Sequence, residues 1–453
     1  MRRFRFSPIQ AAPICQSAAP QDTMEIWRTC MNAHRLLVLA SVVGFAIVAC
    51  AADWPQWRGP GRNGVSKETG LLKQWPPEGP PLLWQVPDIG EGYATPAVAG
   101  ARLYVLGSRG MENEFVQALA VEDGKVLWST RLGNVGSPNQ QPPYPMARST
   151  PTIDGERLYA LGSDGDLACL ETATGKIVWA KNIRAEFNGK PGKWAYAESP
   201  LIDGDVLVVT PGGESATLVA LDKKSGAVIW KSAVPGGDPA AYSSTIALEA
   251  AGRKQYVQFL DKGVVGVDAG TGKFLWRYAK TSTGPANIPT PVAHGGYVYS
   301  ANARRFGGGL VQLHATGGGV SAEEVYFERD VPNTLGGQVL LDGHLYGTNP
   351  KGLVCAEFTT GKLKWQAPGG GPGAVLYAEG LLYVHAESGE VTLVEATPAA
   401  YRERGRFTPP RQPKHVRERE MAWAYPVVAN GRLYIRDLGA LWCYDVKDRK
   451  AAR

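Results

Sequence analysis

The segment CLETATGKIVW, residues 169–179, recurs in four further copies that align without gaps on the final tryptophan. Glycine stands four residues before the tryptophan in every copy. A strand that ends near an acidic residue, a short polar turn and a glycine that can adopt positive φ together predict a bulged β-hairpin. The acidic side chains are therefore expected to accept hydrogen bonds from turn amides and not to act as catalysts. The other copies are ALAVEDGKVLW (118–128), ALDKKSGAVIW (220–230), GVDAGTGKFLW (266–276) and CAEFTTGKLKW (355–365).

A second hairpin precedes each copy, as in TPTIDGERLYALG from Thr150. Similar segments begin at Thr95, Ser199, Thr290 and Tyr425. Two hairpins per repeat give a four-stranded antiparallel blade. Trp84, Trp128, Trp179, Trp230 and Trp276 follow one another at distances of 44, 51, 51 and 46 residues, which matches the length of a propeller blade. The chain of 453 residues is therefore predicted to be one all-β repeat array and not two or three separate domains.

Two weaker repeats complete the series. One has Tyr326 and Phe327 in place of the tryptophan, and the other ends near Phe407. The last repeat stops at Asp445 without an outer strand, and residues 81–84 (PLLW) have the form of that strand. Pairing the two would close the ring and remove two exposed sheet edges. The sequence predicts an eight-bladed propeller closed by an N-terminal strand, with seven blades as the alternative because the seventh repeat is degenerate.

From about residue 54 to 447 the sequence resembles the pyrroloquinoline-quinone-like (PQQ-like) β-propeller family, whose tryptophan-docking motif is similar to Ala-x-Asp-x-x-Thr-Gly-x-x-x-Trp. The TGKxxW endings at Trp179, Trp276 and Trp365 carry this resemblance most specifically. It implies a structural docking role between blades for Trp84, Trp128, Trp179, Trp230, Trp276 and Trp365. The segment DWPQWRGPGRNGVS, from Asp53, resembles the leader of exported family members from planctomycete-type bacteria.

The N-terminal region resembles an export signal. Arg35 precedes an apolar run, 36–48, and small residues follow it. We expect an N-terminal extension plus signal peptide over 1–51 (signal about 31–51), a leader over 52–80, the propeller over 81–447 and a tail over 448–453. Residues 1–30 have no signal character, which a misassigned start codon explains.

The segment IVAC, residues 47–50, resembles a lipobox in which Cys50 is lipidated, and ordinary cleavage after Ala51 is the alternative. The protein is expected to be periplasmic or extracellular, with contact to the membrane only through such a lipid anchor.

Charge and cysteine usage exclude two classes of function. The net charge is +6, and without residues 1–50 there are 43 basic and 40 acidic residues, too even a balance for a nucleic-acid-binding face. Cys169 and Cys355 stand ten residues before a tryptophan, where other copies have alanine or glycine, so we expect a buried position for a small side chain. No CxxC, CxxCH or Cys/His spacing predicts a metal site.

The resemblance implies two kinds of function. Quinoprotein dehydrogenases of this family bind PQQ and Ca²⁺ on the propeller axis and use an aspartate base. They often carry adjacent cysteines or a CxxCH haem site, and this sequence has neither. Non-catalytic relatives include the outer-membrane assembly lipoprotein of the BamB type, although the blades here average nearer fifty residues.

We expect a monomeric, non-enzymatic binding or scaffold protein of the cell envelope whose partner is an envelope protein or a small ligand. No cofactor is predicted. The alternative is a PQQ-dependent quinoprotein dehydrogenase that uses the central funnel. A third reading, a carbohydrate-binding or carbohydrate-hydrolysing propeller, predicts an aromatic platform and close carboxylates at the mouth.

Residues directly before each inner strand should gather around one mouth of the funnel. Arg148, Glu198 and Asn287 combine charge and amide groups that suit an anionic or hydroxylated ligand; the alternative is that they satisfy loop backbones and one another. No catalytic residue is selected. The complete set of candidates is Tyr93, Arg148, Glu198, Tyr242, Asn287, Thr334 and Tyr425.

Overall fold

The computed structural model describes residues 53–136, 144, 146–284, 286–302, 307–415 and 421–449. The expected signal peptide and Cys50 lie outside these residues. Within the described part of the chain, no helix has both the length and the apolar character needed to cross a membrane.

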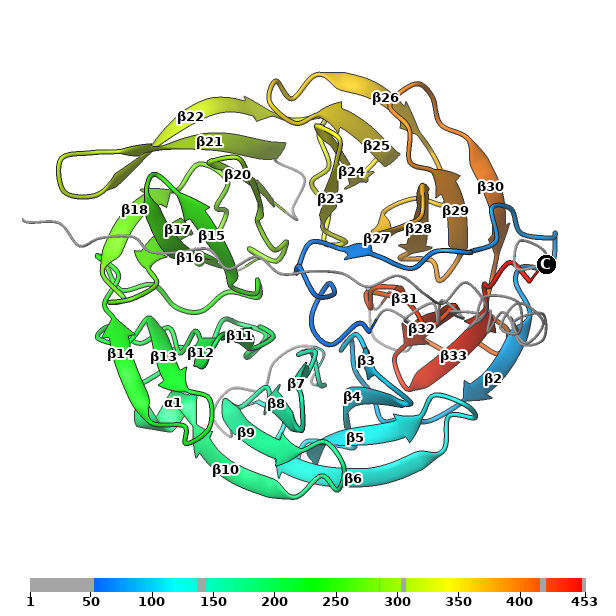
Figure 1. Ribbon diagram of the computed structural model, residues 1–453, viewed down its shortest axis with the longest axis horizontal. Helices are drawn as coiled ribbons and strands as arrows, with labels where there is room; N and C mark the ends of the chain where they lie inside the picture. Colours follow the sequence, from blue (N-terminus) through cyan, green and yellow to red (C-terminus); the bar gives the residue numbers. More distant parts are fainter. Residues whose placement is uncertain are drawn as a thin grey trace, which may run out of the picture. The chain divides into compact units, whose positions relative to one another are not determined.

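The described residues fold into eight sheets arranged as a ring, with one short helix, α1 (Ile183–Glu186) (Figure 1). Seven of the sheets have four strands, and the remaining one gains a fifth, β1 (Val65–Ser66). The predicted all-β, eight-bladed propeller is confirmed, and the seven-bladed alternative is wrong because the degenerate seventh repeat still forms a complete blade.

Blade 1 consists of β3 (Ala97–Ala99), β4 (Arg102–Ser108), β5 (Glu114–Ala120) and β6 (Val126–Gly133), and blade 2 of β7 (Thr152–Asp154), β8 (Arg157–Leu161), β9 (Asp166–Glu171) and β10 (Ile177–Asn182). Blade 3 consists of β11 (Leu201–Asp203), β12 (Val206–Val209), β13 (Leu218–Asp222) and β14 (Val228–Ser232), and blade 4 of β15 (Ile246–Ala250), β16 (Arg253–Leu260), β17 (Gly263–Asp268) and β18 (Phe274–Tyr278). Blade 5 consists of β19 (Val292–His294), β20 (Tyr297–Asn302), β21 (Gly307–Ala315) and β22 (Val320–Glu328). Blade 6 consists of β23 (Gln338–Leu341), β24 (His344–Asn349), β25 (Gly352–Glu357) and β26 (Leu363–Ala367). Blade 7 consists of β27 (Gly373–Ala378), β28 (Leu381–Ala386), β29 (Val391–Glu395) and β30 (Glu403–Phe407).

The eighth blade joins the two ends of the propeller. It consists of β31 (Val427–Ala429), β32 (Arg432–Asp437), β33 (Ala440–Asp445) and, as its outer strand, β2 (Leu82–Val86). The pairing of β2 with β33 is antiparallel and sets Trp84 opposite Cys443. Closure of the ring by an N-terminal strand is therefore confirmed.

The repeated hairpin packs each blade against the next. The indole of Trp128 lies on Gly175 of the following blade, where an added Cβ would come within 2.4 Å of the ring, and its Nε1 donates to the Thr172 carbonyl at 3.0 Å. Gly175 has φ +72°, a conformation that other residues adopt only with strain. Trp84, Trp179 and Trp230 make the equivalent contacts with the turns of the blades that follow them.

Several blade contacts depart from this arrangement. Trp365 of blade 6 keeps only the hydrogen bond, to the Thr397 carbonyl at 2.8 Å. Tyr326 replaces the tryptophan in blade 5, and its hydroxyl donates to the Phe358 carbonyl at 2.9 Å. Trp276 instead donates to Gln255 Oε1 of its own blade at 2.7 Å. The turn that it would face, residues 316–319 between the long strands β21 and β22, lacks the acidic hairpin sequence of the other blades.

Residues 53–68, which we call the plug, run across the inner strands near the axis (Figure 1). The backbone of Trp54 pairs with Val98 of blade 1, and β1 pairs in parallel with β27 of blade 7. Further hydrogen bonds join the plug to blade 2 (Ile153 N to Pro55 O), to blade 3 (Arg62 to the carbonyls of Ser199 and Pro200), to blade 5 (Trp57 to Thr290), to blade 6 (Arg58 to the Gln338 carbonyl) and to blade 8 (Ser66 to the Val428 carbonyl).

The plug separates two cavities. One, of about 360 Å³, is lined by residues that precede the inner strands and by Trp57. The other, of about 320 Å³, is lined by residues 61–63, by residues of the inner strands β15, β19 and β23, and by the turn at Asp342 and Gly343.

Candidate functional site

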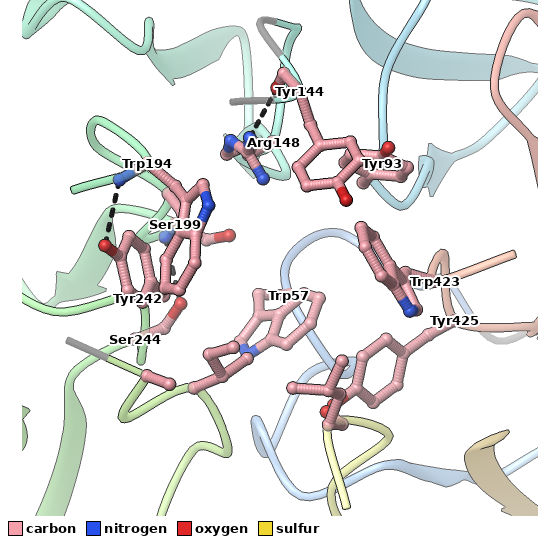
Figure 2. A pocket seen from close by; sticks show the side chains of 14 residues that line it. Trp57, Tyr93, Tyr144, Arg148, Trp194, Ser199, Tyr242, Ser244, Trp423 and Tyr425 are labelled. Carbon is pink, nitrogen blue, oxygen red and sulfur yellow. Dashed lines mark hydrogen bonds between the residues drawn. The ribbon is translucent and has the colours of Figure 1, made fainter. Parts of the chain in front are cut away.

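The cavity that Trp57 lines is the candidate site, and its walls are mainly aromatic (Figure 2). Its volume of about 360 Å³ lies within the range of small-molecule sites. The residues come from the plug and from the segments that precede the inner strands of several blades, so the propeller fold brings distant parts of the sequence together. They are Trp57, Tyr93, Tyr144, Arg148, Trp194, Ala197, Ser199, Tyr242, Ser244, Ala286, Ile288, Leu335, Trp423 and Tyr425.

Polar ends of several rings are bonded to the protein. The Trp57 Nε1 donates to Thr290 Oγ1 at 2.9 Å, and the Tyr425 hydroxyl donates to the Leu335 carbonyl at 2.9 Å. The Tyr242 hydroxyl accepts from the Trp194 amide at 3.0 Å. Burial raises the pKa of Tyr425 to about 12, so this hydroxyl stays protonated at neutral pH. These bonds fix the rings and leave their apolar surfaces as the walls.

The rings pack edge to face and not in parallel stacks. Trp57 and Tyr425 lie 4.6 Å apart at an interplanar angle of 68°, and Tyr93 and Trp423 lie 4.8 Å apart at 57°. Trp194 and Tyr242 are 5.3 Å apart at 58°. These are favourable geometries for aromatic pairs, and they give walls that face the cavity at several angles.

Arg148 is the one ionisable cation that lines the site in the described part of the chain. Its guanidinium lies 5.5 Å from the Tyr93 ring centroid and donates to the Tyr144 carbonyl. Burial lowers its pKa, but a guanidinium remains charged at neutral pH. Glu114 is close enough to interact with Arg148 electrostatically, and burial raises the pKa of this carboxyl to about 7.

Two serine hydroxyls complete the polar groups of the wall. Ser199 Oγ accepts the Thr150 amide at 3.0 Å, and Ser244 Oγ accepts the Ser199 amide at 2.9 Å. The Ser244 amide is 3.4 Å from Thr290 Oγ1, so the Ser or Thr that begins each inner strand links one blade to the next. In the described residues neither serine O–H has a protein acceptor, and both can donate into the cavity.

The structure divides the seven residues expected at the mouth. Tyr93, Arg148, Tyr242 and Tyr425 line the pocket. The other three are buried behind it: Glu198 accepts from Gln258 at 3.0 Å, Asn287 donates to the Leu260 carbonyl at 2.8 Å, and Thr334 bonds Thr348. Each of the three is adjacent in sequence to a residue of the wall, because successive side chains of an extended segment point to opposite sides.

Glu198 lies between the pocket wall and the plug. Its carboxylate also accepts from the Thr210 amide, and burial raises its pKa to about 7 despite the nearby Arg62. Burial lowers the pKa of Arg62 to about 9. Of the polar groups that the sequence analysis placed in the site, Glu198 and Asn287 thus lie behind the wall, and Arg148 lines the pocket.

Four aromatic residues of the wall were not predicted: Trp57, Tyr144, Trp194 and Trp423. Trp423 stands two residues before Tyr425, so alternation along the extended segment was a usable signal. Trp57 comes from the leader, and no repeat pattern indicates that this segment returns to the axis. Tyr144 and Trp194 lie in loops of irregular length.

The wall does not fit the PQQ and Ca²⁺ pair that the resemblance implies. Aromatic faces and Arg148 would suit a flat anionic ring, but the described lining includes no carboxylate for Ca²⁺ and no aspartate to act as a base. No group of three or more His, Cys, Asp or Glu side chains elsewhere in the described residues is placed to hold a metal ion. Cys169, Cys355 and Cys443 are buried free thiols in separate blades.

Comparisons with known proteins agree with the architecture. A model of the family described as outer membrane protein assembly factor BamB matches residues 112–367. The outer membrane protein assembly factor BamB of Moranella endobia is 24% identical over 139 residues, which is 31% of each chain, so the match spans about a third of that relative.

Two solved structures share the fold. BamB from Moraxella catarrhalis aligns with a TM-score of 0.56 and 17% identity, over 81% of this chain and 97% of that one. A quinohemoprotein alcohol dehydrogenase from Pseudomonas putida HK5 aligns with a TM-score of 0.58 and 13% identity, over 88% and 80%. At such identities the likeness establishes the propeller and no activity.

Proposed function

The chain belongs to the PQQ-like propeller family described as outer membrane protein assembly factor BamB, and on that basis we propose that it is an exported binding protein of the cell envelope. Its axial pocket holds part of an envelope component, and the blades around it serve as a rigid scaffold. The protein acts as a monomer in the periplasm or outside the cell, with Cys50 as a lipid anchor in the anchored form.

The character of the pocket wall carries this proposal. Seven aromatic side chains line the cavity, and the polar ends of Trp57, Tyr242 and Tyr425 are bonded to the protein. A concave, mostly apolar wall with a few fixed donors is typical of a binding site. General acid–base chemistry needs a group that can accept a proton near the ligand, and the described wall offers no carboxylate or histidine for that role.

The quinone-dependent dehydrogenase is the second candidate because a quinohemoprotein alcohol dehydrogenase shares the fold. The two functions differ in a simple assay. The purified chain is incubated with Ca²⁺ and PQQ, and alcohol- or aldose-dependent dye reduction is measured. We expect neither stoichiometric quinone binding nor dye reduction; both together would overturn the binding-protein proposal.

A positive test uses the mouth of the pocket. Lys193 is exposed, and its ammonium lies 5.8 Å from the Trp194 ring centroid. A photo-crosslinking residue at position 193 of the full chain, expressed with its own export signal, should capture an envelope component. The crosslink should weaken strongly in Trp194→Ala and Trp423→Ala.

The control places the same crosslinker at Arg329, an exposed residue directly after the outer strand β22. Capture that is equal at both positions, or that ignores the two tryptophan substitutions, would contradict a role for the axial pocket.

A further inference from the structure

The polar groups of the axial pocket are chiefly hydrogen-bond donors. The Arg148 guanidinium and the hydroxyls of Ser199 and Ser244 line the cavity together, and no carboxylate side chain does so among the described residues (Figure 2). A wall of this kind matches a ligand rich in acceptor oxygens. Arginine pairs especially well with a carboxylate or sulfate, because its planar fork can donate two parallel hydrogen bonds.

A cationic ligand is disfavoured by the same group. Cages of aromatic rings often bind quaternary ammonium groups through the negative faces of the rings. Here one ring face is already occupied, because Arg148 lies 5.5 Å from the centroid of Tyr93. A second cation in the cavity would meet a like charge in a site of low dielectric, where repulsion is strong.

The ring angles distinguish a puckered ligand from a flat one. The close pairs in the wall cross at 57° to 81°, so neighbouring rings do not form a parallel slot for a flat aromatic ligand. A sugar ring projects C–H bonds in several directions, and these bonds are attracted to the negative faces of aromatic rings. Its hydroxyl oxygens can accept from Ser199 and Ser244.

Depth and volume limit the size of the ligand. Trp57 of the plug contributes to the wall, and its indole is fixed by Thr290 at 2.9 Å. The cavity has a volume of about 360 Å³. One or two sugar rings suit a site of this volume, so the ligand would insert an end or a side branch of a longer saccharide.

We propose that the axial pocket binds an acidic saccharide, with Arg148 paired to its carboxylate or sulfate and the aromatic walls stacked on its ring. This inference rests on the proposed binding role of the same pocket and names the chemistry of its ligand. Ser199 and Ser244 position the sugar by donating to its hydroxyl oxygens. The anionic group is the feature that separates the preferred ligand from neutral saccharides.

Calorimetric titration of the full chain with four compounds tests the proposal. They are a uronate disaccharide, its carboxyl-reduced neutral counterpart, 2-naphthoate and choline. The uronate should bind at least about tenfold more tightly than the neutral disaccharide, because only the uronate can pair with Arg148. Its affinity should fall as salt rises from about 0.05 M to about 0.5 M, while that of the neutral sugar changes little.

Arg148→Gln should weaken uronate binding by about tenfold and leave neutral-sugar binding within about twofold. Arg329→Gln, which removes an exposed charge after β22, is the matched control and should change neither affinity. Thermal unfolding of each variant shows whether it is folded. If Arg148→Gln does not fold, the comparison of the uronate with its carboxyl-reduced form still decides.

Tighter binding of 2-naphthoate or choline than of the uronate would overturn the proposal, and so would equal binding of the two disaccharides. Failure of every compound at millimolar concentration would also overturn it. Crosslinking from position 193 is an independent readout: if it persists while all saccharides fail, the ligand class is wrong and the envelope role stands. If the uronate binds but crosslinking does not depend on the pocket, the ligand class is right and the envelope role is wrong.

Discussion

The outer and inner rims of the propeller follow different rules. At the outer rim the same contact recurs: an indole from one blade packs on a positive-φ glycine of the next and donates to a turn carbonyl, as in Trp128 with Gly175. At the inner rim the side chains that line the pocket vary between blades, as with Tyr93, Arg148 and Ser199, and blade 7 contributes none among the described residues. The repeated positions specify the ring, and the positions that vary from blade to blade specify what the ring can bind.

The largest effect should come from the outer rim at Gly175. Gly175→Val places a branched side chain at φ +72° and into the Trp128 ring, so we expect a loss of about 4 kcal/mol in the free energy of unfolding, or failure to fold. Urea denaturation measures this loss. The control is Gly155→Ala, which has φ +57° but no neighbour within 4 Å and should lose about 1 kcal/mol. Equal losses at both sites would show that the tryptophan contact does not limit the substitution.

Removal of one tryptophan from each rim compares the two rules directly. Trp84 is 9% exposed and lies where the ring closes, so Trp84→Ala should cost about 3 kcal/mol. Trp194 is only partly buried at the pocket mouth, and Trp194→Ala should cost about 1 kcal/mol or less while ligand binding is lost. Thermal unfolding and calorimetric titration of both variants give the two readouts. A stable Trp84→Ala variant, or an unstable Trp194→Ala variant, would break the distinction between the rims.

A smaller effect should appear in the pH dependence of stability. Burial raises the pKa of Glu198 to about 7, above the value of a carboxyl in the unfolded chain. The folded protein therefore holds this proton more tightly than the unfolded chain. The resulting contribution to the free energy of unfolding is fully present below about pH 4.5 and is lost as the pH rises through 7. Glu198→Gln should make the stability less dependent on pH between 5 and 8.

The exposed Glu249→Gln serves as the control for that experiment and should leave the profile of the wild type unchanged. An unaltered profile in Glu198→Gln would mean that Glu198 is ionised in the folded protein throughout this range.

Most of the fold could be read from the sequence because its determinants repeat. The glycine four residues before each tryptophan, the acidic turn and the hairpin upstream predicted the blades, and PLLW at 81–84 predicted the closing strand. The exception at Trp276 was not foreseen, since it depends on the turn of the next blade and not on the motif itself.

The site was less accessible to sequence reasoning because its members share no pattern. The segments before the inner strands were correctly predicted to line the site. A shift of one residue, however, decides whether a side chain faces the pocket, as with Glu198 and Ser199. The aromatic character of the wall depends on Trp57, whose position follows from hydrogen bonds between the leader and distant blades. Only the folded ring brings these groups together.

The plug also sets a condition on how the molecule assembles. Val65 pairs with Tyr377, and Leu82 pairs with Tyr444, so segments that leave the ribosome first find their partners only after nearly the whole chain has been synthesised. Contacts between residues so distant in sequence are slow to form. Until then the β27 edge of blade 7 and the β33 edge of blade 8 remain open to pairing with other chains. A nascent molecule of this type therefore depends on protection from aggregation until its C-terminal blades have arrived.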